Sequence, residues 1–402
     1  MSAISAIEQA AIEHAASAPM LARTEAWSAI NSGTRNLAGL ATMAGTLADA
    51  FSVLPGHVAL VDPEPVDAVT TEGHAEPIGH GQHLHLAVRP GAPVQILLTG
   101  HMDTVYAADH PFQHGRWTDD GRLNAPGAAD MKGGLALMLA ALEAVEASPL
   151  AAKFGYEVLI NSDEETGSLA SRGLIEGAAR GKVAALTYEP ALPDGTLAGA
   201  RGGTGNFSLV VRGRSAHAGR NPEDGRNALV AAADLALRLA AARAPQLAVN
   251  PARIDGGGPN NVVPDLAILR VNFRPKDESA IAQARVALEA AASDVMVAHD
   301  VAIEVHGSFN RPPKPIDPGA ARLFELVRAS GADLGIPIGW RDSGGVCDGN
   351  NIAACGVPVV DTMGARGGAI HSAEEFLIPE SLPERAGLSA LTILRLAERG
   401  RP

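Results

Sequence analysis

The segment LLTGHMD, Leu97 to Asp103, decides the fold of this chain. The apolar run that leads into it, Val94 to Leu98, predicts a buried strand. Thr99-Gly100 is a turn signal, so we expect His101 and Asp103 just past the carboxyl end of that strand. Open α/β sheets bind their ligands at this edge. A histidine with a carboxylate two residues later suits a metal ligand and its orienting partner, although such a pair also occurs by chance.

Two later segments place acidic residues in comparable positions. The run AADMKGG predicts the start of a helix that ends near Glu146, with Asp130 at its N-cap position. The run SDEETGS follows a predicted strand at 156–161 and carries the adjacent pair Glu164 and Glu165. Such a pair either forms a solvated acidic loop or is neutralised by a positive partner.

Two further predicted strands complete the pattern. The strand at 183–187 leads to Glu189, and the strand at 357–361 leads through a glycine-rich loop to His371. The chain thus brings histidines and carboxylates to several strand ends. Two histidines and three carboxylates are a suitable ligand set for two zinc-like ions. A shared carboxylate would bridge two ions that lie about 3.5–4 Å apart.

Five motifs in this order resemble the dinuclear zinc carboxypeptidase and deacylase family. That family includes bacterial glutamate carboxypeptidase, acetylornithine deacetylase, succinyl-diaminopimelate desuccinylase and aminoacylase. The motifs are LLTGHMDTV, NAPGAADMKGG, NSDEETGS, YEP and GAIHSAEE. The similarity extends from about Val94 to the C-terminus, and five motifs in order are far more specific than any one of them.

The resemblance implies two divalent metal ions per chain, zinc or alternatively cobalt or manganese, and it assigns their ligands. It implies one metal site with His101 and Glu189, a second with Glu165 and His371, and Asp130 as the bridge. It also implies that Asp103 orients His101 and that Glu164 is the general base. The residues alone do not say which adjacent glutamate binds metal. A base must stay free of the metal to accept a proton from water and pass it to the leaving amine.

Two residues of the expected lid take roles from the resemblance. His217 would reach the active site of the other subunit of a homodimer and polarise the scissile carbonyl. Without the resemblance, His217 would be an ordinary loop histidine. Asn261 would donate a hydrogen bond to the substrate across the same interface.

The resemblance also implies a set of substrate-binding residues. Arg201 and Arg274 match positions that hold a substrate carboxylate, for which the planar guanidinium is suited, and Arg311 is a third candidate. For Arg274 a structural ion pair is an equal alternative. Gly344 and Gly345 would let backbone N–H groups approach the α-carboxylate of the substrate.

The pattern of predicted elements indicates an α/β fold with two domains. Up to about Ala200, strands alternate with helices, which is typical of a mixed sheet flanked by helices. Residues 203–310 predict the order β-α-β-β-α-β, a ferredoxin-like unit. We expect a zinc-exopeptidase-like catalytic domain from residues 1–202 and 311–402. The resemblance implies that the inserted unit, residues 203–310, is a lid and dimerisation domain.

Composition narrows the partners and the compartment. The 402-residue chain has a formal net charge of −13, which argues against nucleic acid or an anionic membrane as partner. The first 19 residues predict an amphipathic helix rather than a signal peptide. The two cysteines, Cys347 and Cys355, could pair but make no disulfide framework, so we expect a reducing, cytoplasmic location. A thiol nucleophile at Cys347 is not needed in a metal-dependent hydrolase.

These observations lead to one functional expectation. The chain would be a hydrolase of the glutamate carboxypeptidase type, which cleaves an amide bond next to a free carboxylate in an N-acyl amino acid or small peptide. One alternative is an aminoacylase, deacetylase or desuccinylase of a small N-acyl metabolite. Another is a non-catalytic binding protein on the same fold, but both Glu164 and Asp130 are present, which favours an enzyme.

Overall fold

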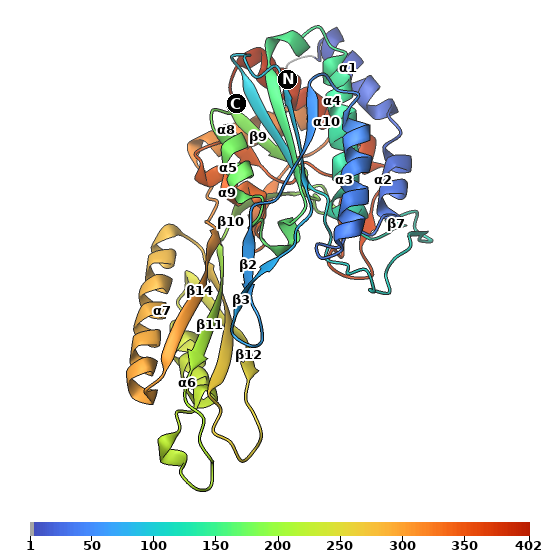
Figure 1. The fold of residues 1–402 in the computed structure, drawn as a ribbon. Helices are drawn as coiled ribbons and strands as arrows, with labels where there is room; N and C mark the ends of the chain where they lie inside the picture. Colours follow the sequence, from blue (N-terminus) through green and yellow to red (C-terminus); the bar gives the residue numbers. More distant parts are fainter. Residues whose placement is uncertain (1–3) are drawn as a thin grey trace.

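A six-stranded mixed sheet forms the centre of the larger domain in this computed structural model, which describes residues 4–402 (Figure 1). The strands pair in the order β1 (His57–Val61), β4 (His83–Val88), β8 (Gly155–Asn161), β5 (Gln95–His101), β9 (Ala184–Thr187), β16 (Val359–Val360). The first two pairings are antiparallel and the other three are parallel. The predicted mixed α/β sheet is therefore confirmed.

Helices cover both faces of this sheet because its strands are apolar on both sides. Along β5, Ile96 and Leu98 pack into the larger core and Leu97 packs into the smaller one. The larger core contains α1 (Ala6–Ser17), α2 (Met20–Ser28), α3 (Leu37–Phe51), α4 (Gly133–Glu146), α8 (Pro318–Asp333) and α10 (Ser381–Arg399). The smaller core contains α5 (Arg172–Ala179) and α9 (Asp348–Ala354). The central sheet is buried, so chemistry is confined to its strand ends.

The inserted unit forms a second sheet with its own core. Its elements are β11 (Thr204–Arg212), α6 (Ala228–Ala241), β12 (Leu247–Gly256), β13 (Leu266–Pro275), α7 (Glu278–His299) and β14 (Ala302–Arg311). The strands pair antiparallel in the order β12-β13-β11-β14, the ferredoxin-like arrangement. Phe207 and Phe273 pack edge to face beneath the two helices. In Figure 1 this lid extends away from the larger domain.

A hairpin from the larger domain reaches the lid, a feature that the sequence did not indicate. It consists of β2 (Val66–Val69) and β3 (Ala75–Ile78) and runs beside the lid sheet in Figure 1. Arg270 Nη2 donates to the carbonyl of Val69 at 2.8 Å, and Arg212 Nη2 donates to the carbonyl of Gly73 at 2.7 Å. These two contacts tie the lid to the larger domain.

Shorter strands frame the site at the sheet edge. β10 (Leu197–Arg201) pairs in parallel with β15 (Trp340–Ser343). A small sheet joins β6 (Arg116–Trp117), β7 (Leu123–Asn124), β18 (Phe376–Leu377) and β17 (Gly367–Gly368). His371 lies in the loop between β17 and β18, so this small sheet holds it beside the central one.

Two local predictions were wrong. Thr99-Gly100 is not a turn, because β5 pairs with β8 through His101. A Cβ at position 100 would lie 2.6 Å from Leu135 Cδ2 and 2.7 Å from Met131 Cε, so a larger residue there would displace these side chains. Asp130 is not an N-cap, because it lies in a separate turn (Ala128–Lys132), and α4 begins at Gly133. His101 therefore lies within a strand and Asp130 within a buried turn, and neither lies at the end of a helix.

The predicted N-terminal helix corresponds to α1, which packs against α4 and α10. Residues 1–3, which the prediction included, lie outside the described part of the chain. None of the described helices combines the length and apolar character that a membrane crossing requires. Cys347 is buried, Cys355 is exposed, and both thiols are free.

Candidate metal centre

Three parallel strands deliver the first candidate ligands to one edge of the sheet. His101 is the last residue of β5, Glu189 lies two residues beyond β9, and the turn Glu164–Thr166 follows β8. Because β8, β5 and β9 are adjacent and parallel, their carboxyl ends meet. This edge is where α/β sheets place their ligands.

Asp130 lies between the two histidines. Its Oδ1 is 3.0 Å from His101 Nε2, and its Oδ2 is 3.3 Å from His371 Nε2. Glu189 Oε1 lies 3.7 Å from His101 Nε2, and Glu165 Oε2 lies 3.2 Å from His371 Nε2. Each histidine therefore has its own glutamate, and the two share one aspartate. This arrangement is compatible with two ligand sets that share one carboxylate.

Crowding of buried carboxylates shifts several pKa values in this cluster. Burial raises the pKa of Glu165 to about 7, and the nearby Asp130 adds to the shift. Burial also raises the pKa of Glu189. Hydrogen bonds to Asp130 and Glu165 raise the pKa of His371 to about 11. The raised pKa values favour the protonated forms of these residues, which reduces the repulsion between the carboxylates. A bound divalent cation would reduce this repulsion instead. Imidazole nitrogens and carboxylate oxygens are zinc ligands, so these residues fit the metal.

Asp103 connects the histidine to the glutamate turn. Its Oδ1 is 3.4 Å from His101 Nδ1 and accepts the backbone N–H of Glu164 at 3.1 Å. Its Oδ2 accepts the backbone N–H of Glu165 at 3.2 Å and the Thr34 hydroxyl at 2.7 Å. The side chain is fully buried. Asp103 therefore fixes the turn as well as the imidazole.

Glu164 differs from Glu165 in its partner. Its Oε1 accepts from Arg311 Nη2 at 2.7 Å, and its carboxylate makes no hydrogen bond to either histidine of the cluster in the described structure. Burial raises the pKa of Glu164 well above its usual range, and Arg311 opposes this shift. A carboxylate oxygen of Glu164 nevertheless lies within 4.8 Å of ligand atoms of His101 and Glu189. A small movement of the side chain would therefore bring Glu164 within reach of a metal ion held by these two residues.

Glu375 was not assigned a role from the sequence. Its Oε1 accepts the backbone N–H groups of Ala129 and Asp130, each at 3.0 Å, and its Oε2 accepts that of Gly127 at 3.1 Å. The Tyr106 hydroxyl also donates to Oε2 at 2.7 Å. The side chain therefore holds the backbone of the turn that carries Asp130. The signal was the acidic pair after His371, but nothing in the sequence indicated its partners.

A cavity of about 420 Å³ opens beside these residues. Among its lining residues are Asp130, Glu164, Glu165, Glu189, Leu192, Leu197, Arg201, Arg341, Gly344, Gly345, Ile370 and His371. Carboxylates, one histidine, apolar side chains and a glycine-rich loop thus line the cavity. This is the composition of a small-molecule site.

The arginines in this region have different surroundings. Arg201 Nε and Nη2 donate to Asp361 at 2.7 and 3.2 Å, and Nη1 donates to the carbonyl of Gly345 at 3.1 Å. Its guanidinium therefore supports the glycine loop. Arg341 lines the same cavity and is exposed. Arg274 lies in an adjoining cavity of about 560 Å³ and donates to Asn272 at 2.8 Å.

Cys347 also lines the first cavity, but its surroundings disfavour a thiolate. Its thiol lies 3.6 Å from Asp361 Oδ2. Burial raises the pKa of the Cys347 thiol well above its usual range, and Arg201 opposes this shift only in part. A thiol that stays protonated is a poor nucleophile.

His217 and Asn261 do not line either cavity. They lie on two neighbouring lid loops, where the N–H of Ala218 donates to the carbonyl of Asn261 at 2.9 Å. In Figure 1 the loops that follow β11 and β12 are at the end of the lid remote from the larger domain. The structure thus brings the two residues together but keeps them away from the metal centre of their own chain.

Comparison with known proteins gives a consistent assignment. The sequence model described as peptidase family M20/M25/M40 matches residues 97–395. Carboxypeptidase G2 from Pseudomonas sp. (strain RS-16) is 31% identical over 311 residues, which cover 75% of this chain and 74% of the relative. Succinyl-diaminopimelate desuccinylase from Verminephrobacter eiseniae is 26% identical over 304 residues, 70% of this chain and 74% of the relative.

The fold has close counterparts among solved structures. A tripeptidase from Staphylococcus aureus superposes with a TM-score of 0.71 at 23% identity, over 94% of this chain and 98% of that one. The likeness covers the lid as well as the larger domain. At this identity it shows the fold alone.

Proposed function

The chain belongs to peptidase family M20/M25/M40, and from that premise we propose that it is a two-metal hydrolase of the carboxypeptidase type. It would cleave an amide bond next to a free carboxylate in an N-acyl amino acid or a small peptide. The observation that carries the proposal is the position of Asp130 between His101 and His371, each of which has a glutamate of its own. The similarity to carboxypeptidase G2 supports the carboxypeptidase form of the reaction.

Five residues would hold the metals. His101 and Glu189 would bind one ion, Glu165 and His371 the other, and Asp130 both. Zinc ions in these positions would polarise the scissile carbonyl and lower the pKa of water towards about 7. Asp103 and Glu375 would keep the ligands in place through the imidazole of His101 and the backbone at Asp130.

Glu164 would transfer the proton. It lines the cavity and makes no hydrogen bond to the two cluster histidines within the described structure. Its carboxylate would accept a proton from the attacking water and deliver it to the leaving nitrogen as the C–N bond breaks. The products are a carboxylic acid and an amine, so one water is consumed for each bond cleaved.

The substrate carboxylate would bind at the glycine loop. Gly344 and Gly345 line the cavity, and Arg201 fixes the loop through the carbonyl of Gly345. Arg201 would therefore act through the loop. Arg274, in the adjoining cavity, would contact only a longer substrate.

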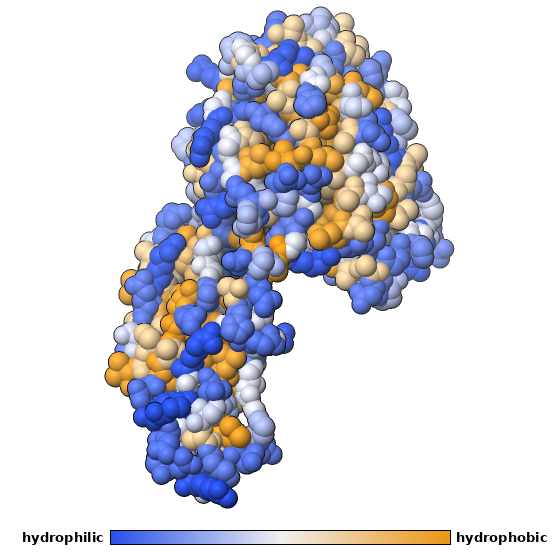
Figure 2. Space-filling model, viewed as in Figure 1, coloured by the Kyte–Doolittle hydropathy of each residue, from blue (hydrophilic) through white to orange (hydrophobic). Residues whose placement is uncertain are grey.

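A homodimer would complete each site. His217 and Asn261 are remote from the cavity of their own chain, so their proposed contacts with substrate need a second subunit. Strand β12 lies at the edge of the lid sheet, and the neighbouring helix α6 exposes Val230 and Leu237. Apolar residues are visible along the lid in Figure 2. An open strand edge beside apolar side chains supports association through the lid.

A substrate screen tests the proposal. The protein would be stripped with a chelator, reloaded with zinc, cobalt or manganese, and assayed with N-acyl amino acids, N-succinyl amines and dipeptides. Each substrate would be paired with its C-terminal amide. We expect metal-dependent cleavage that requires the free carboxylate. Preference for acyl-amine substrates without that carboxylate would favour a deacylase, to which the similarity to the desuccinylase points.

A further inference from the structure

The guanidinium of Arg311 holds Glu164 at two points. Arg311 Nη2 donates to Glu164 Oε1 at 2.7 Å and to the backbone carbonyl of Glu164 at 3.0 Å. Arg311 is the last residue of β14, by which the chain returns from the lid. One cation from a distant part of the sequence thus fixes both the backbone and the carboxylate of the same residue.

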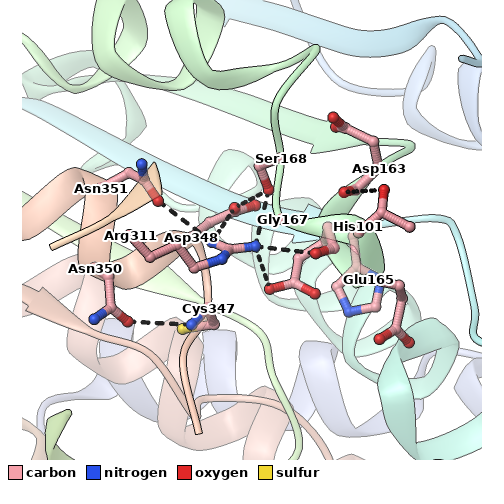
Figure 3. A network of polar contacts seen from close by, with 12 residues as sticks. His101, Asp163, Glu165, Gly167, Ser168, Arg311, Cys347, Asp348, Asn350 and Asn351 are labelled. Atoms are coloured by element: carbon pink, nitrogen blue, oxygen red, sulfur yellow. Dashed lines mark hydrogen bonds and ion pairs between the residues drawn. The ribbon is translucent and has the colours of Figure 1, made fainter. Parts of the chain in front are cut away.

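The guanidinium also contacts residues other than Glu164 (Figure 3). Nη1 donates to Asp348 Oδ1 at 2.8 Å and to Asn351 Oδ1 at 3.3 Å, and Nη2 also donates to the hydroxyl of Ser168 at 3.0 Å. Asn161 in turn donates to Asp348 Oδ2 at 2.7 Å. Arg311 is 1% exposed, and the described lining of the metal cavity does not include it. Both terminal nitrogens, Nη1 and Nη2, donate to groups of the protein, so they do not form a free fork for a substrate carboxylate.

The position of Glu164 explains why such an anchor is needed. Its carboxylate comes within 4.8 Å of ligand atoms of His101 and Glu189. Carboxylate oxygen is a normal zinc ligand, so a mobile glutamate at this distance would be drawn to a divalent cation. A carboxylate that coordinates a metal ion is a weaker base, because the cation stabilises its deprotonated form.

We propose that Arg311 is a positioning residue that keeps the Glu164 carboxylate out of the metal coordination shell and directed at the cavity. The proposal rests on the proposed two-metal function. A charge-assisted pair with two anchoring contacts on the same residue is suited to this task, because it opposes rotation of the glutamate side chain. Asp348 accepts from Nη1 of Arg311, on the other side of the guanidinium from Glu164. This second ion pair holds Arg311 in place when Glu164 gains or loses a proton.

The test replaces the cation and follows the metal spectroscopically. Arg311→Met and Arg311→Lys would be compared with Arg395→Met, a matched control. Arg395 is also buried between two carboxylates, Glu8 and Asp333, but it is remote from the cavity. Because removal of one charge can unfold the protein, Arg311→Met/Asp348→Asn would restore the buried charge balance while Glu164 stays unanchored.

Cobalt(II) loaded in place of zinc gives a readout that needs no substrate. Entry of Glu164 into the coordination shell raises the coordination number and weakens the visible absorption band of cobalt. We expect a weaker band in Arg311→Met and in Arg311→Met/Asp348→Asn, and recovery of the band when Glu164→Gln is added. Arg395→Met should keep the wild-type spectrum. In a turnover assay, Arg311→Met should lose about 10²-fold or more in kcat with little change in KM.

The outcomes separate two failures. An unchanged cobalt spectrum in both Arg311→Met variants, or near-normal kcat with two metals bound, would overturn the positioning role and leave the proposed function intact. A wild-type protein that binds no cobalt would overturn the proposed function and, with it, the role of Arg311. A wild-type protein that binds two ions but cleaves none of the substrates would contradict the proposed reaction, while the spectra would still decide the role of Arg311.

Discussion

The carboxylates of Glu164 and Glu165 lie against different cationic partners, although the two residues are adjacent in the chain. Glu164 Oε1 is 2.7 Å from Arg311 Nη2, and Glu165 Oε2 is 3.2 Å from His371 Nε2. The turn that carries both residues is fixed because Asp103 accepts their backbone N–H groups. In the proposed reaction this divergence separates the base, Glu164, from a metal ligand, Glu165.

Replacement of the two glutamates should therefore have different effects. Glu164→Gln should keep the fold and both metals but lose about 10²–10⁴-fold in kcat, the usual contribution of general base catalysis. Glu165→Gln should lose metal as well, because an amide is a weaker ligand than a carboxylate. Metal analysis and steady-state kinetics on both variants check this. Near-normal kcat in Glu164→Gln would contradict its assignment as the base.

Glu375 should control metal affinity without touching a metal. It accepts three backbone N–H groups of the turn around Asp130. Glu375→Gln places an amide N–H against these donors, so the turn should shift. Loss of such a supporting contact typically lowers metal affinity about 10–100-fold. Competition with a chromophoric chelator measures the affinity, and Glu374→Gln, an exposed neighbour, is the matched control. Equal affinities in the two variants would remove this role.

The sequence could indicate that the candidate ligands lie close together because this information is local. His101, Glu164, Glu165 and Glu189 each lie at or just after a parallel strand, and parallel strands bring their ends together. His371 follows a shorter strand by a loop, yet its motif was also recognisable.

The supporting contacts could not be predicted because they join segments far apart in the chain. Arg311 and Glu164 are 147 residues apart, and Glu375 and Asp130 are 245 apart. Nothing near Arg311 in sequence shows that its guanidinium is buried instead of facing substrate. The hairpin β2–β3 was missed for a similar reason, since its partners Arg212 and Arg270 belong to the lid.

His217 should act on the site of the partner subunit. His217→Ala should retain both metals and lose much of kcat, because an oxyanion donor typically contributes about 2.7–4 kcal/mol to the transition state. Mixing inactive Glu164→Gln subunits with inactive His217→Ala subunits should restore activity. In a mixed dimer one site carries both lesions and the other carries neither, so activity should approach half the wild-type value per heterodimer.

The control for this experiment is the extent of subunit exchange, followed by native mass spectrometry. If exchange is complete and no activity returns, each site retains one lesion. His217 would then act within its own chain or have only a structural role.

Metal binding should release protons. In the metal-free protein the pKa of His371 is raised to about 11 by Asp130 and Glu165, so His371 carries a proton at pH 7 that must leave when metal binds. The pKa of Glu165 is raised to about 7, so it is partly protonated there as well. Apparent metal affinity should therefore rise with pH. Calorimetry in two buffers of different ionisation enthalpy should show net proton release, and identical heats would contradict this reading of the cluster.

The number of metal ions bound per chain tests the central claim most directly. Chelator-stripped protein, titrated with zinc and followed by elemental analysis after gel filtration, should retain two ions per chain. Asp130→Ala removes the carboxylate shared by His101 and His371, so it should lose tight binding of at least one ion. A wild-type stoichiometry of zero or one, or retention of two tightly bound ions by Asp130→Ala, would contradict a centre in which Asp130 bridges two metals.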